Sequence, residues 1–114
     1  MKFSVNQQDI QTSLNYCQGV IEKRSTLPIL SNVLIEAKNK ILSLTATDLD
    51  LIFVNKILNV EIMEEGKTTT SSSIMYDIVR KISSGKKINF SKDGDAKISL
   101  ESENSNFNLN CINA

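Results

Sequence analysis

The chain has 114 residues, a length that suits one folded domain with a single hydrophobic core. Hydrophobic residues make up 40% of it and charged residues 23%, as in ordinary globular proteins, which excludes a disordered or fibrous class. The 13 basic residues balance the 13 acidic ones, which argues against a protein that covers nucleic acid with positive charge. Any contact with nucleic acid must therefore be local and weak.

The sequence has few of the residues that usually bind metals or act as catalytic nucleophiles. The chain has no histidine and two distant cysteines, Cys17 and Cys111, which excludes the usual zinc patterns and the common nucleophile and base pairs. We expect both cysteines to be buried and reduced, and we expect no metal and no cofactor. The N-terminus turns polar after Val5, and no stretch approaches the roughly 20 apolar residues of a membrane span. We expect a cytoplasmic protein without a membrane partner.

The first half predicts a strand, a helix and three further strands. Met1, Phe3 and Val5 alternate with polar residues, as in a half-buried strand. Asn6 is placed to cap a helix that runs to about residue 21, with one apolar face: Ile10, Leu14, Cys17 and Ile21. Residues 22–28 predict a loop, and residues 29–37, 41–47 and 51–60 predict strands of an antiparallel meander.

The same order of elements recurs from about residue 67. Residues 67–71 favour a strand, and Ser72 or Ser73 is placed to cap a helix with the apolar stripe Ile74, Met75, Ile78, Val79 and Ile82. Gly85 suits a left-handed residue at the end of that helix. Strands are predicted at residues 87–92, 96–101 and 105–112. The sequence therefore predicts an α+β fold in two layers, with a duplicated β-α-β-β-β unit and both helices on one face of an antiparallel sheet.

Several segments match one protein family at the same spacing. Residues 26–36 read TLPILSNVLIE, preceded by Arg24, and residues 42–51 read LSLTATDLDL. Together with the opening MKFSV and the DIVR of residues 77–80, they resemble bacterial sliding clamps, the beta subunits of DNA polymerase III. The resemblance covers the chain nearly end to end.

This resemblance implies the DNA-clamp (processivity) fold and a non-catalytic role in DNA replication. Subunits of the family have three such domains, and two chains close head to tail into a homodimeric ring that encircles duplex DNA and tethers the polymerase by enclosure. Residues 1–114 are then expected to be the N-terminal domain, with further domains after Ala114. The clamp loader and the DNA polymerase are expected to bind through domains absent here.

The resemblance also suggests residues for the wall that faces DNA. Arg24 stands where the family places a basic residue against the DNA backbone, and a solvated loop arginine is the alternative. Arg80 and Lys81 at the end of the second helix are further candidates, and they would also complement the helix dipole. Gln11 and Asn15 belong to a polar row on the first helix that suits water-mediated phosphate contacts or plain solvation: Gln7, Gln8, Gln11, Asn15 and Gln18.

The last strand and the second helix have a second expected role. In the family they meet the third domain of the neighbouring chain, which implies Ile74, Ile78, Phe107 and Leu109 at or beside the ring-closing interface. The alternative is that all four belong to the core, which Ile78 favours most. Family members often add basic residues on the last strands, whereas residues 101–106 read ESENSN here, so closure by ion pairs is in doubt.

Two rival functions come from other classes. A scaffold module would keep the fold without forming a ring. A metal-dependent DNA-processing enzyme would need acid pairs such as Asp48 with Asp50 or Asp93 with Asp95, but both pairs flank turns, where aspartate is favoured for local hydrogen bonds. The four glycines are isolated, so no phosphate-binding loop is present either. We expect no catalytic residues.

Overall fold

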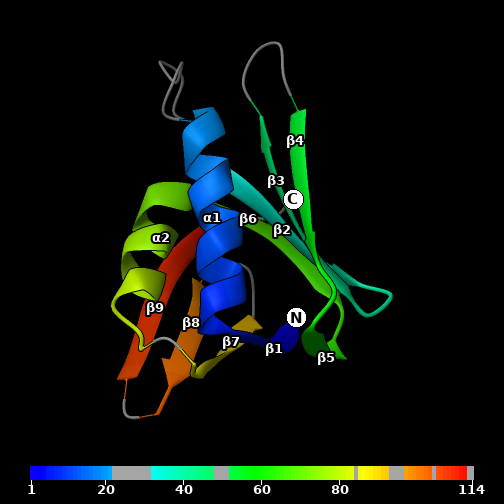
Figure 1. Cartoon of the computed structure of the whole chain (residues 1–114). Helices are drawn as coiled ribbons and strands as arrows, with labels where there is room; N and C mark the ends of the chain where they lie inside the picture. Colours follow the sequence, from blue (N-terminus) through cyan, green and yellow to red (C-terminus); the bar gives the residue numbers. More distant parts are fainter. Residues whose placement is uncertain (22–31, 48–51, 84, 93–96, 104, 113–114) are drawn as a thin grey trace.

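The computed structural model describes residues 1–21, 32–47, 52–83, 85–92, 97–103 and 105–112. Within them two helices, α1 (Gln7–Ile21) and α2 (Ser72–Arg80), lie side by side on one face of a sheet, as Figure 1 shows. The strands are β1 (Lys2–Asn6), β2 (Asn32–Lys38), β3 (Ile41–Thr47), β4 (Ile52–Ile57), β5 (Val60–Glu64), β6 (Gly66–Ser71), β7 (Lys87–Lys92), β8 (Lys97–Ser102) and β9 (Ser105–Ile112). Neither helix is long and apolar enough to cross a membrane.

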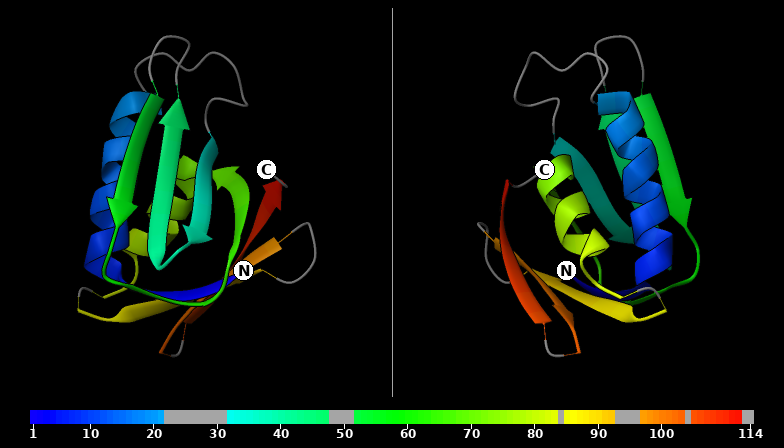
Figure 2. Two further views of the ribbon diagram at one scale, coloured as in Figure 1. Left: turned by 90° about the vertical axis from the view of Figure 1, so that its right-hand side faces the viewer. Right: turned by 60° about the vertical axis from the view of Figure 1, so that its left-hand side comes forward.

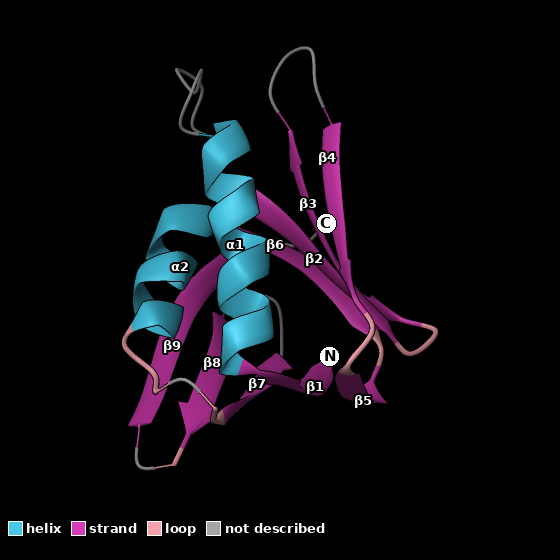
Figure 3. Ribbon diagram, viewed as in Figure 1, coloured by secondary structure: helices cyan, strands magenta, loops and turns pink. Residues whose placement is uncertain are grey.

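All the strands join one antiparallel sheet in the order β4-β3-β2-β6-β9-β8-β7-β1-β5. The sheet bends around the two helices, so that β2, β3 and β4 form one wall and β7, β8 and β9 another (Figure 2). Figure 3 shows the resulting separation of helices from strands. The predicted two-layer α+β fold is confirmed.

The two repeated units exchange their first strands. The residue before α1, Asn6, pairs with Lys87, the first residue of the strand that follows α2. The residue before α2, Ser71, pairs in the same way with Asn32, the first residue of the strand that follows the gap after α1. Each half therefore lacks one strand of its sheet without the other half, and the duplication produces one interlocked domain.

One predicted strand is two strands in the structure. Residues 51–60 were expected to form a single strand, but β4 ends at Ile57 and β5 starts at Val60. β4 lies at one end of the sheet order, whereas β5 pairs with β1 at the other end. The prediction is wrong because the break consists of only two residues, Leu58 and Asn59, without glycine or proline, so the local sequence gives no strong signal where the chain changes its pairing partner.

The core lies between the helices and the bent sheet. Ile10, Leu14 and Cys17 of α1 are fully buried, as are Met75 and Val79 of α2. They pack with alternate residues of the strands: Phe3, Val33, Ile35, Leu42, Leu44, Ile88, Phe90, Ile98 and Leu100. The rings of Phe3 and Phe90 stack with centroids 4.7 Å apart and bind β1 to β7. Each large side chain buried in this way contributes about 1.5–3 kcal/mol to the hydrophobic stabilisation.

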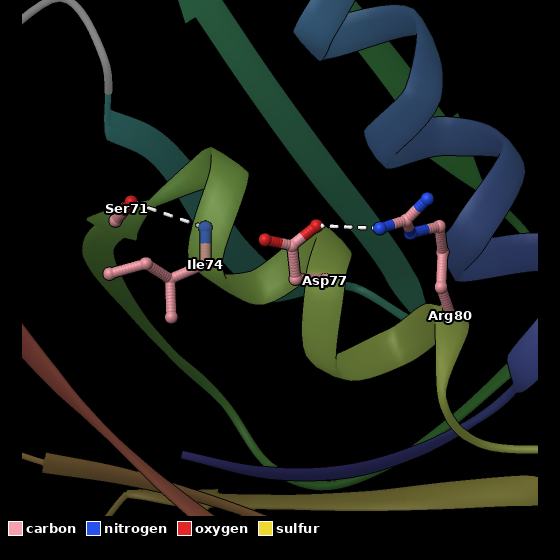
Figure 4. Close-up of polar contacts among 4 residues, drawn as sticks. All are labelled: Ser71, Ile74, Asp77 and Arg80. Carbon is pink, nitrogen blue, oxygen red and sulfur yellow. Dashed lines mark hydrogen bonds and ion pairs between the residues drawn. The ribbon is translucent and has the colours of Figure 1, made fainter.

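The ends of α2 differ from the prediction in detail. The N-cap is Ser71, whose Oγ accepts a hydrogen bond from the Ile74 amide at 3.4 Å (Figure 4). The predicted cap was Ser72 or Ser73, which is wrong by one or two residues, because β6 continues to Ser71 and the helix follows without a gap. Gly85 has the expected left-handed conformation, with φ of 85°, but it lies in the turn after the helix, which ends at Arg80.

Candidate functional site

The outward surface of α1 is polar and carries little charge. Between Gln7 and Ile21 the only charged residue is Asp9. Asn15 and Gln8 are exposed and Gln11 is half-buried, so these members of the predicted polar row can reach solvent. Gln7 and Gln18, in contrast, are 2% and 8% exposed, and their expected place on the DNA-facing row is wrong.

Gln7 instead ties the two helices together. Its Nε2 donates to the backbone carbonyl of Val79 at 2.9 Å and to Oε1 of Gln11 at 2.5 Å. Its own backbone amide donates to the carbonyl of Lys86 at 2.8 Å, so the first turn of α1 is attached to the segment that follows α2. The helical period of the sequence contains this signal, because residues 7 and 18 fall on the same face as Ile10, Leu14 and Cys17.

The C-terminal end of α2 presents two cations beside this polar surface. Arg80 is exposed, and its Nη2 lies 3.0 Å from Oδ1 of Asp77, as Figure 4 shows. The guanidinium carbon of Arg80 is 5.1 Å from the centroid of the Tyr76 ring, within the range of a cation–π contact. Lys81 is exposed and forms the C-cap, where positive charge complements the helix dipole. Tyr76 and Asp77 were not among the predicted site residues, although a spacing of three residues on a helix brings Asp77 close to Arg80.

Two of the predicted ring-closing residues, Ile74 and Leu109, line a groove formed by α2, β6 and β9. β9 pairs with β6 only at Ile112 and Cys111, and the two strands then separate. A groove of about 380 Å³ lies there, lined by Asn32, Thr69, Thr70, Ser71, Ile74, Lys97, Asn108, Leu109, Asn110 and Cys111. Ile74 is 51% exposed, whereas Leu109 is 6% exposed and forms part of the floor.

The structure thus divides the four predicted interface residues into two pairs. Ile74 and Leu109 line the groove. Leu109 also belongs to the buried core, and Ile78 and Phe107 are partly buried and pack against that core, as the alternative for these residues anticipated. The groove therefore has an exposed apolar contact at Ile74, and Ile78 and Phe107 stabilise the domain that carries it.

Alternate residues of β9 form a row of amides, of which Asn108 and Asn110 also line the groove. Asn106, Asn108 and Asn110 are exposed, in agreement with the strict alternation of the last strand. Asn108 Oδ1 accepts from Ser99 Oγ at 2.7 Å, and Asn106 Nδ2 donates to Glu101 Oε1 at 3.3 Å. Lys97, at the rim of the groove, is the cation nearest to this row in the pairing of β8 with β9.

Some predicted features lie outside the described residues. These are Arg24, the proposed DNA contact, and both aspartate pairs, Asp48 with Asp50 and Asp93 with Asp95. Within the described ranges, no group of three or more histidine, cysteine, aspartate or glutamate residues could hold a metal ion. Cys17 and Cys111 are free thiols and buried as predicted, and burial raises the pKa of Cys17 to about 11.

Two solved structures of DNA sliding clamps share this fold. The clamp of Caulobacter crescentus superposes with a TM-score of 0.91 at 34% identity, over 100% of this chain and 31% of that one. The DnaN sliding clamp of Bartonella birtlesii gives a TM-score of 0.89 at 39% identity, over 99% of this chain and 32% of that one. The interlocked sheet with its two helices is therefore a sliding-clamp domain.

The sequence also matches one particular protein family. Residues 1–114 match the family described as DNA polymerase III beta subunit, N-terminal domain, and the chain belongs to this family. Among its relatives, the beta sliding clamp of Escherichia coli (strain K12) is 33% identical over 114 residues, which are 100% of this chain and 31% of that protein. The beta sliding clamp of Caulobacter vibrioides (strain NA1000 / CB15N) is 34% identical over 110 residues, 96% of this chain and 29% of the relative. The chain thus spans about three tenths of the length of these relatives.

Proposed function

We propose that residues 1–114 are the first of three domains in a subunit of a ring-shaped DNA clamp. Two such subunits would encircle duplex DNA and tether the replicative polymerase by enclosure, as a non-catalytic processivity factor in the cytoplasm. The observation that carries this proposal is the family match over the whole chain, together with a fold in which both helices lie on one face of the sheet. The clamp loader and the polymerase would bind through the other domains.

In this proposal the surface of α1 and α2 faces the DNA. The contacts are Arg24, Arg80 and Lys81 on phosphates, with Gln11 and Asn15 making water-mediated contacts. A ring that holds DNA by enclosure needs no tight grip, and a chain with equal numbers of acidic and basic residues fits that requirement. Exposed amides beside a few cations also favour contacts that exchange easily as the ring moves along the duplex.

The groove between α2 and β9 would be one half of the ring closure. Ile74 offers exposed apolar area there and Leu109 lines the groove, while Ile78 and Phe107 pack against the core that includes Leu109. A second clamp subunit would cover this groove in the head-to-tail dimer. Because Asn106, Asn108 and Asn110 dominate the neighbouring face, hydrogen bonds and apolar packing are expected to contribute more than ion pairs.

Enclosure can be tested with the intact protein on circular DNA. After loading by its clamp loader, the protein should elute with a circular plasmid in gel filtration at a salt concentration that abolishes binding to short linear duplex. Cutting the plasmid once should release it, because a ring slides off a free end. Retention on the linear plasmid would contradict enclosure and favour direct binding.

Ring closure can be tested separately by charge insertion. Ile74→Arg should shift the intact protein from dimer to monomer in sedimentation velocity, because it buries a charge in the groove. Met63→Arg is the matched control, since Met63 is 58% exposed on β5, far along the sheet from the groove. An unchanged dimer in Ile74→Arg would exclude the groove from the interface.

A further inference from the structure

Arg80 already has a carboxylate partner at the surface proposed to meet DNA. The ion pair with Asp77 spans one turn of α2, and the two side chains are 53% and 58% exposed. The Tyr76 ring lies under the guanidinium group at 5.1 Å and holds it near the helix surface. A carboxylate and a phosphate bind guanidinium through the same N–H donors, so an incoming phosphate would meet an occupied partner.

We propose that Asp77 is an internal competitor of DNA phosphates for Arg80 and weakens the contact of this domain with DNA. This inference rests on the proposed function, because it requires Arg80 to face the duplex. Asp77 holds the guanidinium between encounters, and a phosphate replaces or shares it at each encounter. Asp77 therefore acts as a positioning residue that sets how long each contact lasts.

The energetics of the pair suit such an exchange. An exposed ion pair at this spacing is weak, so little free energy is lost when a phosphate displaces the carboxylate. Asp77 engages Arg80 through Nη2, in a single contact at 3.0 Å, which is not the two-bond arrangement of the strongest arginine–carboxylate pairs. The Tyr76 ring contact does not depend on Asp77, so the guanidinium remains at the surface while its anionic partner changes.

Because the two helices carry few charged residues, Asp77 contributes a large share of the charge on this surface. Along Gln7–Ile21 and from Ser72 to Lys81, the charged residues are Asp9, Asp77, Arg80 and Lys81. The two acidic residues cancel the two basic ones, so these helices attract DNA weakly. Removing the charge of Asp77 both frees Arg80 and leaves a net positive surface.

A charge-matched set of variants tests this inference on the intact protein. Binding to a fluorescently labelled linear duplex at low salt is measured by anisotropy for Asp77→Asn, Arg80→Ala and the double variant. Asp77→Asn should tighten binding by about two- to five-fold, the range that corresponds to a weak surface ion pair. Glu61→Gln is the control, because it removes the same charge at an exposed position of β5, the strand at the end of the sheet order.

The variants separate the two ideas. If Arg80→Ala does not weaken binding, Arg80 does not contact DNA and that part of the proposed function fails. If Arg80→Ala weakens binding but Asp77→Asn tightens it no more than Glu61→Gln does, Arg80 keeps its role and the competition by Asp77 is overturned. When Arg80 is already replaced by alanine, Asp77→Asn should raise the affinity for DNA no more than Glu61→Gln does. A gain that persists without Arg80 would also overturn the competition.

Discussion

The two halves of the chain repeat one order of elements, yet their helices have different surroundings. α1 has 15 residues and contacts β1, β3, β4 and α2, whereas α2 has nine residues and contacts chiefly α1 and β6. α1 is tied to β4 by a hydrogen bond from Ser13 to Asn55 at 2.8 Å and by the Tyr16 and Phe53 rings. α2 leaves Ile74 exposed and carries both cations of the pair of helices.

This difference shows that the two halves of an internal duplication can have different roles in stability and in function. The first helix, α1, packs against three strands and the other helix, and its buried face stabilises the domain. The shorter α2 keeps more of its surface open, beside the groove at β9 and at its basic C-terminal end. The features with a proposed function among the described residues are therefore concentrated in the second half.

The largest change in the free energy of unfolding is expected when a core side chain of α1 is shortened. Leu14 is fully buried, so Leu14→Ala should lower the free energy of unfolding by about 2–5 kcal/mol through lost burial and a cavity. Ile74→Ala on α2 should change it far less, since Ile74 is half exposed. Urea unfolding of both variants measures the contrast. Equal losses would mean that Ile74 is as important for folding as the core of α1.

The link between the helices should be next in size. Gln7→Ala removes the hydrogen bond from the side chain to the Val79 carbonyl, which still accepts from the Ile82 amide at 3.1 Å, so the loss of stability should be about 0.5–1.5 kcal/mol. Gln8→Ala is the control, because Gln8 is the exposed neighbour on the same helix and should change stability by less than about 0.5 kcal/mol. A neutral Gln7→Ala would show that this bond does not hold α1 to α2.

Loss of the cap on α2 should be smaller still. Ser71→Ala removes the acceptor for the Ile74 amide and should cost about 0.5–2 kcal/mol, towards the lower end because the bond is long at 3.4 Å. Ser105→Ala, at the exposed start of β9, serves as the control. Thermal unfolding followed by circular dichroism would measure both, and a loss as large as that of Leu14→Ala would contradict the secondary role given to α2.

The smallest effect concerns β5, which only the first half contains. The N-terminal ammonium group donates to Glu64 Oε1 at 2.7 Å and lowers the pKa of that carboxyl. Because the folded pKa is below the unfolded one, the contact stabilises the protein above the ordinary glutamate pKa of about 4.3 and is lost as the pH falls through the folded pKa. The melting temperature of wild type should therefore exceed that of Glu64→Gln at neutral pH and converge with it in acid. A constant gap would contradict this contact.

Much of the fold was predictable because it rests on local patterns. Apolar residues at helical spacing fixed α1 and α2, and alternation fixed the strands that have one buried face, such as β3 and β9. The break between β4 and β5 was missed because it depends on pairing with β1, a partner distant in sequence. The exchange of first strands was also not predicted, since local periodicity does not say which strands become neighbours.

The candidate site was predictable only in part, for a related reason. All four residues were expected at or beside one interface. Ile74 and Leu109 do line one groove, but Leu109 belongs to the buried core, and Ile78 and Phe107 pack against that core. The polar row of α1 was assigned to solvent by residue type, but Gln7 and Gln18 are buried. Residue type alone cannot show that an amide will find a backbone partner on another helix, as Gln7 does at Val79.

The sequence by itself determined the duplicated α+β plan, the balanced charge and the resemblance to sliding clamps, because composition, period and motif spacing are local properties of the chain. Only the tertiary structure decided that the two units interlock and that Gln7 joins the helices. These features depend on long-range pairing and on the orientation of individual side chains, and both are selected by packing of the whole domain.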